Sequence, residues 1–328
     1  MQTSKKPFFS VLTPSWNRAD FLGILINSLQ NQTFQDFEWV IGNDGSVDNT
    51  HELLTEKFND LNIPITYIAS NIRIGKSKLD NLLLDNAKGK YLVWCDADDF
   101  FTSDALECIF KIIQENKINS DVDIAGVISQ NVDTNGKSQT FNLSSNIPPD
   151  GLYKFHELEQ YLIGDGTICV KNTIFDNKRW PEVDFLITES ILLRPLYKDK
   201  KFYFTADILK IMDRGAENSV SFGTKLQYCR GSAYSLAGTL SVKKYEAMSI
   251  FSKIQKVINY FRYCSHGDIP FFEAVKIWQV IQDKKWLICL YPIATLLVLF
   301  DLLRNKVIKT HIEFEHNKKL ADINIKNF

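Results

Sequence analysis

The first hundred residues alternate short apolar runs with longer stretches in which apolar residues recur every three or four positions. The short runs predict buried strands, and the longer stretches predict amphipathic helices. The predicted strands cover residues 8–13, 37–41, 65–69 and 91–95. The predicted helices begin at Asp20, at Ser46 or Asp48, and ahead of an apolar stripe in residues 79–87. This alternation predicts an α/β fold whose mostly parallel sheet is flanked by helices on both faces.

The later part of the chain changes character. Its predicted elements are a helix over about 102–116, a strand over 124–129, a turn at 133–138 and mixed helix and strand over 180–221. Beyond residue 243, apolar residues recur at helical spacing, with lysines on the opposite side. We therefore predict one domain over residues 1–222 and a helical, basic C-terminal region over residues 223–328.

Polar residues gather where three of the predicted strands end. They occupy residues 14–18 after the first strand, 43–46 after the second and 96–99 after the fourth. In open parallel sheets, ligands bind in the crevice outside the carboxyl ends of the strands. We therefore expect these three segments to lie together and to form the functional site.

The stretch VWCDADDF contains Asp96, Asp98 and Asp99 directly after the fourth strand. Residues two apart in an extended chain share a face, so the Asp96 and Asp98 carboxylates can converge on one cation. Magnesium and manganese prefer such oxygen ligands and commonly bridge them to phosphate oxygens. The alternative is an acidic loop that caps the helix beginning near Thr102.

Two further stretches have candidate chemistry. In NDGS, Asp44 can accept a hydrogen bond from a base N–H, although Gly45 and Ser46 alone explain a turn. In NIRIGKSKLDN, Lys76 can approach phosphate oxygens at the start of a helix, or it is simply a solvated lysine. A P-loop is excluded, because Ser70 stands where that motif requires glycine.

Charge and cysteine content narrow the class of protein. The net charge of −1 argues against a general nucleic-acid binder. Residues 241–328 contain 14 Lys/Arg and 8 Asp/Glu, whereas the rest of the chain has a net charge of −7. The six cysteines lie scattered, with no CxxC pair and no zinc-like spacing, which is typical of reduced thiols in a cytosolic protein.

Taken together and in order, the motifs TPSWNRAD, NDGS, NIRIGKSKLDN, WCDADD and FLITES resemble family 2 glycosyltransferases of the GT-A fold. The resemblance covers roughly residues 8–222. It implies transfer of a sugar, with inversion, from a nucleotide-diphosphate sugar, usually a UDP-sugar, assisted by Mn²⁺ or Mg²⁺. It also implies a nucleotide-binding half over residues 1–100 and an acceptor-binding half over residues 101–222.

The resemblance implies roles for individual residues of the donor site. Thr13 and Pro14 would line the nucleotide pocket, and Asp44 would contact the base. Lys76 would approach the base or the diphosphate, and Asn81 matches an asparagine of the same element. Asp96 would face the ribose or the metal, Asp98 would bind the metal, and Asp99 would either support the metal-binding residues or lie near the donor sugar. Asn81 can equally be an amide that packs within its helix.

Inverting transfer requires a carboxylate beside the acceptor hydroxyl. Many members of the family have Glu-Asp at the corresponding place, whereas this chain has Glu189 followed by Ser190. A subset with Thr-Glu after a Trp-Pro or Phe-Pro segment matches better. We predict Glu189 as the base, with Asp184 in reserve, against the alternative that Glu189 only caps a helix or pairs with Arg194.

Residues 286–300 form an uncharged run with basic residues on both sides. As a helix it would be about 22 Å long, shorter than the hydrocarbon core of roughly 30 Å. It is therefore a buried helix, an interfacial segment on anionic lipid or, less in keeping with its length, a membrane span. We expect a cytoplasmic protein whose residues 286–303 either contact the inner face of the cell membrane or pack as core.

The predicted function is sugar transfer to a glycan or lipid-linked acceptor in polysaccharide biosynthesis. One alternative is a related module that binds nucleotide or glycan without turnover, which the missing carboxylate after Glu189 favours. The other is a nucleotidyltransferase. Such enzymes usually have a glycine-rich loop after the first strand, and the stretch TPSWNRAD contains no glycine.

Overall fold

The computed structural model describes residues 6–140, 147–159, 161, 166–183, 185–213, 229–240, 249–277, 285–303 and 322–328. Contacts divide the chain into two units. The first consists of Met1–Arg179, Asp199–Asn218 and Asn317–Phe328, and the second of Trp180–Lys198 and Ser219–His316. The predicted boundary after residue 222 lies outside the described residues and stays a prediction.

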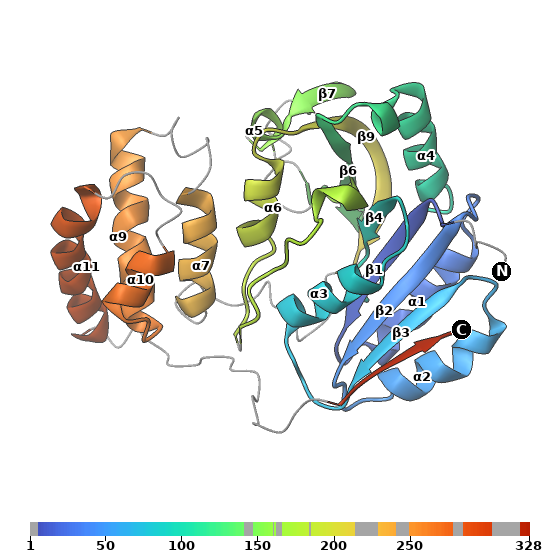
Figure 1. The fold of residues 1–328 in the computed structure, drawn as a ribbon, viewed down its shortest axis with the longest axis horizontal. Helices are drawn as coiled ribbons and strands as arrows, with labels where there is room; N and C mark the ends of the chain where they lie inside the picture. The colour runs from blue at the N-terminus through green and yellow to red at the C-terminus, as the bar shows by residue number, and fades with distance from the viewer. Residues whose placement is uncertain are drawn as a thin grey trace. The chain divides into compact units, whose positions relative to one another are not determined.

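The first unit is built on one mixed sheet (Figure 1). Its strand order is β10-β3-β2-β1-β4-β8-β6-β9-β5, and β7 pairs with β9. The neighbours from β3 to β4 are parallel, as are β6 and β9, and the other pairs are antiparallel. The bounds are β1 Phe9–Ser15, β2 Phe37–Asp44, β3 Ile65–Ser70, β4 Tyr91–Trp94, β5 Asp99–Phe101, β6 Ile124–Asp133, β7 Gly151–Lys154, β8 Thr167–Lys171, β9 Lys201–Met212 and β10 Ile323–Asn327.

Helices cover both faces of this sheet, as predicted. They are α1 Ala19–Gln30, α2 Thr50–Lys57, α3 Lys76–Asn86, α4 Ala105–Glu115 and the short α5 Phe155–Leu158. Alternate strand residues such as Val11, Trp39 and Ile41 share one core with apolar residues of α1, α2 and α4. On the other face α3 packs so closely on β2 that a Cβ at Gly42 would lie 2.6 Å from a methyl carbon of Leu79. The two-residue alternation of the strands therefore explains why helices lie on both sides.

The last described strand comes from the C-terminal end of the sequence. Strand β10 pairs antiparallel with β3, which is otherwise the edge of the parallel strands (Figure 1). Phe328 donates its N–H to the Ile65 carbonyl at 2.9 Å, and its ring lies 4.9 Å from that of Phe58. The pattern of apolar residues in this segment did not predict a strand.

The secondary-structure elements described in the second unit are helices. Its helices are α6 Ser190–Tyr197, α7 Cys229–Leu240, α9 Ile250–His266, α10 Phe271–Ile277 and α11 Lys285–Leu303. A small core of residues including Val257, Tyr260 and Phe261 joins α7, α9, α10 and α11. The helical spacing predicted beyond residue 243 is confirmed by α9, although residues 243–248 lie outside the described residues.

Candidate active site

The loops after β1 and β2 are tied together at the carboxyl end of the sheet. The Asn17 N–H donates to the Ser46 hydroxyl at 2.9 Å, and the Val47 N–H donates to the Asn17 side-chain oxygen at 2.9 Å. The Arg18 N–H donates to the Thr50 hydroxyl at 3.0 Å. These bonds join the first two polar segments, so the predicted meeting of segments 14–18 and 43–46 is confirmed.

Asp44 organises the loop that leads into α3. Its carboxylate accepts hydrogen bonds from the N–H groups of Ile74 at 2.6 Å and Gly75 at 3.1 Å. Burial raises the pKa of the Asp44 carboxyl, while these N–H groups and the Arg73 guanidinium, 4.0 Å away, act in the opposite direction. Gly45, with φ +62°, is required beside it, because a Cβ there would lie 2.3 Å from the Ile72 carbonyl carbon.

A stacked pair lies next to Asp44 and was not singled out from the sequence. The Arg73 guanidinium carbon lies 3.5 Å from the centroid of the Trp16 ring. Burial lowers the pKa of Arg73, with Asp44 acting in the opposite direction. Trp16 and Arg73 come from two of the quoted motifs, but sequence spacing gives no sign that they meet.

Lys76, the first residue of α3, lies between two carboxylates. Its ammonium is 3.2 Å from Asp80 within the same helix and 3.5 Å from Asp96 after β4. Desolvation acts to raise the pKa of Asp96, but the charges of Lys76 and Lys210 outweigh it and hold that pKa below its usual value. Lys76 is therefore held at the acidic segment, which disfavours its interpretation as a merely solvated lysine.

Asp98 is paired with a cation from the first loop. The Arg18 Nε donates to the Asp98 carboxylate at 3.1 Å, with both side chains mostly buried. Desolvation and the neighbouring Asp96 charge raise the pKa of Asp98, and Arg18 offsets only part of this effect. The residues Arg18 and Asp98 are eighty positions apart in the sequence, so only the fold brings them together.

Asp99 is the most deeply buried of the three carboxylates. It is 3% exposed, and the Lys210 ammonium of β9 lies 2.7 Å from it. Burial raises the pKa of Asp99 to about 6 although Lys210 opposes this. Burial acts to lower the pKa of Lys210, but Asp99 and its acidic neighbours raise it overall. This ion pair anchors β5 to β9 within the sheet.

The three carboxylates thus turn toward three different cations, Arg18, Lys76 and Lys210. Among the residues that the structure describes, no group of three or more His, Cys, Asp or Glu side chains is arranged to hold a metal ion. The half-exposed Asp96 and the mostly buried Asp98 still offer the oxygen ligands that Mg²⁺ and Mn²⁺ accept in ones or twos when phosphate oxygens complete the shell. The residues therefore fit a metal that arrives together with a diphosphate.

The remaining predicted donor-site residues lie on nearby elements. Thr13 is buried in β1, where its hydroxyl accepts a hydrogen bond from the Trp39 indole at 2.9 Å. Pro14 is half-buried and lies beside Gly42 at the end of β1. Asn81 is buried within α3. Their predicted contacts with a nucleotide stay predictions.

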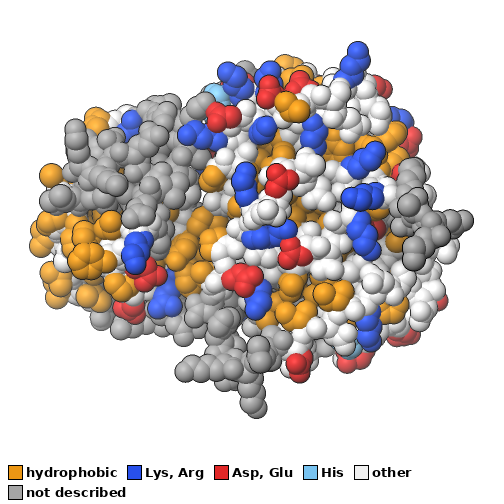
Figure 2. Space-filling view, in the orientation of Figure 1, with side chains coloured by type: hydrophobic (Ala, Val, Ile, Leu, Met, Phe, Trp, Pro, Cys, Tyr) orange, Lys and Arg blue, Asp and Glu red, His pale blue; other side chains and the backbone are white. Residues whose placement is uncertain are grey.

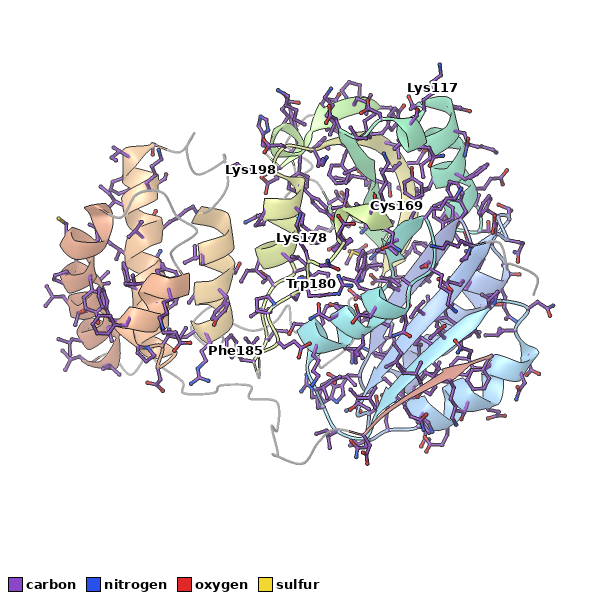
Figure 3. All side chains as sticks on the ribbon, in the orientation of Figure 1. Lys117, Cys169, Lys178, Trp180, Phe185 and Lys198 are labelled. Atoms are coloured by element: carbon purple, nitrogen blue, oxygen red, sulfur yellow. The ribbon has the colours of Figure 1, made fainter. Side chains whose placement is uncertain are left out.

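The candidate base belongs to the second unit. Glu189 occupies the position before α6, and its side chain is exposed. Its carbonyl accepts hydrogen bonds from the Trp180 indole at 3.2 Å (Trp180 is labelled in Figure 3) and from the Leu192 and Leu193 N–H groups. Asp184 lies outside the described residues. The role of either carboxylate stays a prediction.

Comparison with known proteins identifies the family. The model of glycosyl transferase family 2 matches residues 10–176, which include all of the donor-site segments described above. The chain belongs to this family. The resemblance predicted from the sequence motifs is therefore confirmed.

Two curated relatives are named for transfer to different acceptors. The GalNAc(5)-diNAcBac-PP-undecaprenol beta-1,3-glucosyltransferase of Campylobacter jejuni is 29% identical over 203 residues, which cover 60% of this chain and 62% of that protein. TarS of Staphylococcus aureus, a poly(ribitol-phosphate) beta-N-acetylglucosaminyltransferase, is 32% identical over 116 residues, which cover 35% of this chain and 20% of TarS. The chain thus spans less than two thirds of the length of these family 2 relatives.

Solved structures agree on the fold. Residues 1–349 of S. aureus TarS in complex with UDP-GlcNAc superpose with a TM-score of 0.54 at 14% identity, covering 94% of this chain and 97% of that one. This likeness confirms the predicted GT-A α/β architecture with a helical C-terminal region.

Proposed function

We propose that this protein transfers a sugar from a nucleotide-diphosphate sugar, a UDP-sugar by preference, to a glycan or lipid-linked acceptor in polysaccharide biosynthesis. The observation that carries the proposal is the convergence of the Asp44 loop, Lys76 and the Asp96–Asp98 segment at one sheet edge, inside the matched family 2 region. Polar groups at the carboxyl ends of parallel strands suit binding of a nucleotide.

In this proposal the donor lies along that edge. Asp44, which already orders the 74–75 backbone, receives an N–H of the base on its remaining acceptor capacity, because a carboxylate offers about four lone-pair sites. Thr13 and Pro14 line the nucleotide pocket, and Asn81 supports α3. Lys76 moves its charge from Asp96 toward the diphosphate.

Asp98 and Asp96 would hold Mn²⁺ or Mg²⁺, and Asp99 would shape the donor-sugar side of the site. When bound, such an ion neutralises the charge that develops on the departing diphosphate. Arg18 competes with the ion for Asp98, so Asp98 becomes available only when Arg18 turns elsewhere. The diphosphate, which carries negative charge, is a natural alternative partner for that guanidinium.

Inversion requires a base on the acceptor side of the anomeric carbon. We assign this role to Glu189, whose exposed carboxylate can take the proton of an acceptor hydroxyl, with Asp184 in reserve. The exposed side chain is compatible with access to an acceptor, and Ser190 leaves it without a second carboxylate next in sequence.

A lipid surface is proposed as the place where the protein meets its acceptor. Within residues 289–303, whose side chains the structure describes, helix α11 buries a narrow stripe formed by Leu290, Ala294 and Asp301. Its exposed large apolar residues are Ile293, Leu296, Leu297, Leu299, Phe300, Leu302 and Leu303. Figure 2 shows hydrophobic side chains at the surface of the helical unit.

No helix in the described part of the chain is long and apolar enough to cross a membrane. An apolar helix face with basic residues in the same region suits the interface of an anionic bilayer.

The name of the C. jejuni relative supports the same acceptor class, because its substrate is attached to undecaprenol through a diphosphate. The proposal for this chain is accordingly a peripheral association of α11 with the membrane and a lipid-linked saccharide as acceptor.

Thermal-shift measurements with UDP-, GDP- and ADP-sugars, with and without Mn²⁺, test the donor assignment. A bound donor raises the melting temperature as its concentration exceeds its dissociation constant. We expect a UDP-sugar to do so with Mn²⁺, and slow hydrolysis of that donor to follow. Binding without hydrolysis or transfer over a panel of acceptors would favour the binding module, and pyrophosphate release from a sugar phosphate and a nucleoside triphosphate would favour a nucleotidyltransferase.

Glu189→Gln tests the base in the same assay. If Glu189 takes the acceptor proton, transfer falls while donor binding measured by thermal shift stays unchanged. Wild-type transfer by this variant would direct the search to Asp184.

A further inference from the structure

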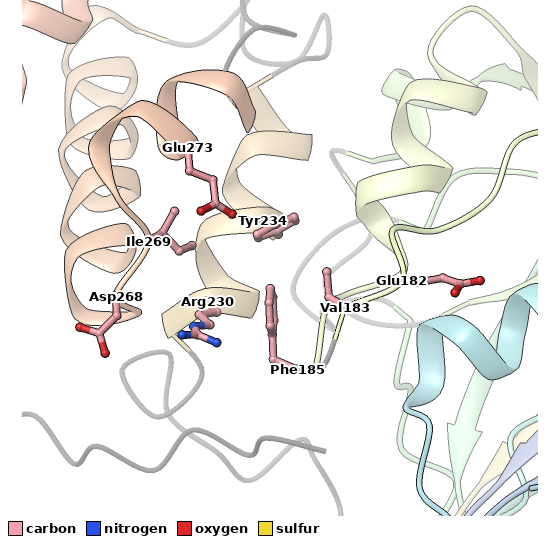
Figure 4. Close-up of a pocket in the computed structure, with 8 residues that line it drawn as sticks. All are labelled: Glu182, Val183, Phe185, Arg230, Tyr234, Asp268, Ile269 and Glu273. Carbon is pink, nitrogen blue, oxygen red and sulfur yellow. The ribbon is translucent and has the colours of Figure 1, made fainter. Parts of the chain in front are cut away.

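A cavity of about 460 Å³ lies within the second unit (Figure 4). Its lining comes from three places, namely residues 182, 183 and 185, helix α7, and the turn between α9 and α10 with the start of α10. Cavities of roughly 300–1,000 Å³ suit small-molecule ligands. The donor site proposed above lies in the first unit, so this cavity requires an explanation of its own.

Aromatic rings form one wall of the cavity. The Phe185 and Tyr234 rings meet edge to face with centroids 5.3 Å apart, and the buried Ile269 adds an aliphatic surface. Figure 4 shows these side chains around the same space, whereas Glu182 points away from them. Aromatic and aliphatic walls contact the C–H faces of a ligand and leave its polar edge to other groups.

Arg230 fixes the shape of the cavity. Its Nε donates to the Gly267 carbonyl at 2.7 Å, and its guanidinium carbon lies 5.7 Å from the centroid of Phe185. A Cβ at Gly267 would lie 2.8 Å from the Arg230 side chain, so glycine is needed there. At Gly231, a Cβ would lie 1.9 Å from the Leu186 carbonyl oxygen. Two glycines thus allow α7 to lie against both neighbouring segments.

The polar groups of the lining favour a particular ligand chemistry. Asp268 and Glu273 are exposed carboxylates that accept hydrogen bonds, and Arg230 only donates them. Among the described lining residues, acidic side chains outnumber the one cation, Arg230, so a phosphate or a uronic acid is disfavoured by charge. Several hydroxyl groups on a ring with an apolar face satisfy both the carboxylates and the aromatic wall.

We propose that this cavity binds a neutral sugar ring of the acceptor glycan. The proposal rests on the proposed sugar transfer, which requires an acceptor. The lining residues 182, 183 and 185 are close in sequence to Glu189 and belong to the same unit, so an acceptor in contact with Phe185 is bound partly by the segment that carries the candidate base.

Saturation-transfer NMR on the full chain tests the proposal with methyl glycosides of glucose, N-acetylglucosamine and N-acetylgalactosamine as probes. Saturating UDP and Mn²⁺ are present to keep the probes out of the donor site, and methyl glucuronide serves as the anionic probe. We expect transfer to at least one neutral glycoside and at least fivefold weaker transfer to the glucuronide.

Three variants locate the binding. Tyr234→Ala and the conservative Glu273→Gln are each expected to weaken the signal at least fivefold, whereas Phe272→Ala, a matched aromatic change at an exposed neighbouring position, leaves it unchanged. Melting curves establish that each variant is folded. Because Glu273 is exposed, Glu273→Gln keeps the test decisive if Tyr234→Ala does not fold.

The proposal is overturned if no neutral glycoside receives saturation, or if Glu273→Gln and a folded Tyr234→Ala bind like the wild type. Thermal shifts with nucleotide-sugars are measured in parallel. A donor shift without glycoside binding rejects the cavity proposal alone, whereas glycoside binding without any donor shift supports the cavity and rejects the proposed transferase.

Discussion

The two units of this protein differ in the side chains that mark their candidate sites, which are paired carboxylates at the sheet edge in the first unit and the exposed apolar face of α11 in the second. In the first unit, the carboxylates at the sheet edge are at least partly buried and each is matched by a cation from another element. In the second unit, large apolar side chains such as Leu303 and Phe272 are more than three-quarters exposed. Unpaired charge is costly inside a protein, and a large exposed apolar surface marks an interaction site. On this difference rest our proposals of a charged ligand for the first unit and of apolar and saccharide partners for the second.

Among the changes that test this difference between the units, removal of Asp98 is expected to have the largest effect. Asp98→Ala should lower metal-dependent donor hydrolysis about 1,000-fold, or about 4 kcal/mol, because stabilisation of the departing diphosphate is lost. The measurement is nucleotide release from the UDP-sugar with Mn²⁺. Asp20→Ala, which removes an exposed carboxylate on α1, is the control and should leave the rate unchanged. Full activity of Asp98→Ala would reject the metal role.

Asp301 is the one buried carboxylate among the described residues of the helical unit. Its replacement tests whether the stability of that unit also depends on paired charge. Asp301 accepts hydrogen bonds from Arg262 at 2.5 and 2.6 Å and lies 3.0 Å from His266. Asp301→Ala should lower the free energy of unfolding of this unit by about 3 kcal/mol at pH 7, because two donors lose their partner. Urea denaturation measures this change, and Asp20→Ala again serves as control.

The same variant has a pH dependence with a definite sign. Burial acts to raise the pKa of Asp301, but the Arg262 and His266 hydrogen bonds lower it overall. A depressed folded-state pKa stabilises the fold above the unfolded value of about 3.9, and this stabilisation is lost as the pH falls through the folded value. The difference between wild type and variant should therefore be complete at pH 7 and shrink below about pH 4. A constant difference over this range would contradict the ionic explanation.

Membrane contact by α11 is tested by making its exposed face polar. The double change Leu296→Ser and Leu299→Ser should lower partitioning onto phosphatidylglycerol vesicles about tenfold, or about 1.4 kcal/mol, because two exposed apolar side chains no longer enter the interface. Sedimentation with vesicles measures it. Ile24→Ser, at an exposed position of the first unit, should leave binding unchanged.

Two results would count against the membrane assignment. One is equal partitioning of the double variant and the wild type. The other is a concentration-dependent dimer of the wild type that the double variant abolishes, since this would assign α11 to a contact between two copies of the chain.

The smallest expected effect concerns the competition between Arg18 and a metal ion. Arg18→Gln should raise the Mn²⁺ affinity of the nucleotide-free protein about fivefold, or about 1 kcal/mol, because Asp98 no longer holds a competing cation. Electron paramagnetic resonance of free Mn²⁺ measures it without turnover. Arg179→Gln, which breaks the exposed pair with Asp85, should have no effect. A weakened or unchanged Mn²⁺ affinity of Arg18→Gln would show that Arg18 does not compete with a metal ion for Asp98.

Much of the fold could be predicted because its signals are local. The apolar runs and stripes gave strands β1 to β4 and helices α1 to α4 within a few residues of their ends. The stretch DTNGKS forms the predicted tight turn, with Gly136 at φ +79° and its N–H bonded to the Asp133 carbonyl at 2.8 Å. In each case the conformation of a short segment is determined by residues within that segment, namely by the spacing of its apolar residues or by its turn-forming residues and glycine.

The sequence by itself determined the family, the parallel strands and the position of the acidic segment at their carboxyl ends. Only the tertiary structure decided that Arg18, Lys76 and Lys210 each take one of the carboxylates of that segment. It also decided that β10, a mostly exposed strand with weak apolar alternation, adds to β3, and that residues 180–198 belong with the helices that follow. Such pairings join residues tens to hundreds of positions apart, and their free energy depends on burial and distance that no local pattern contains.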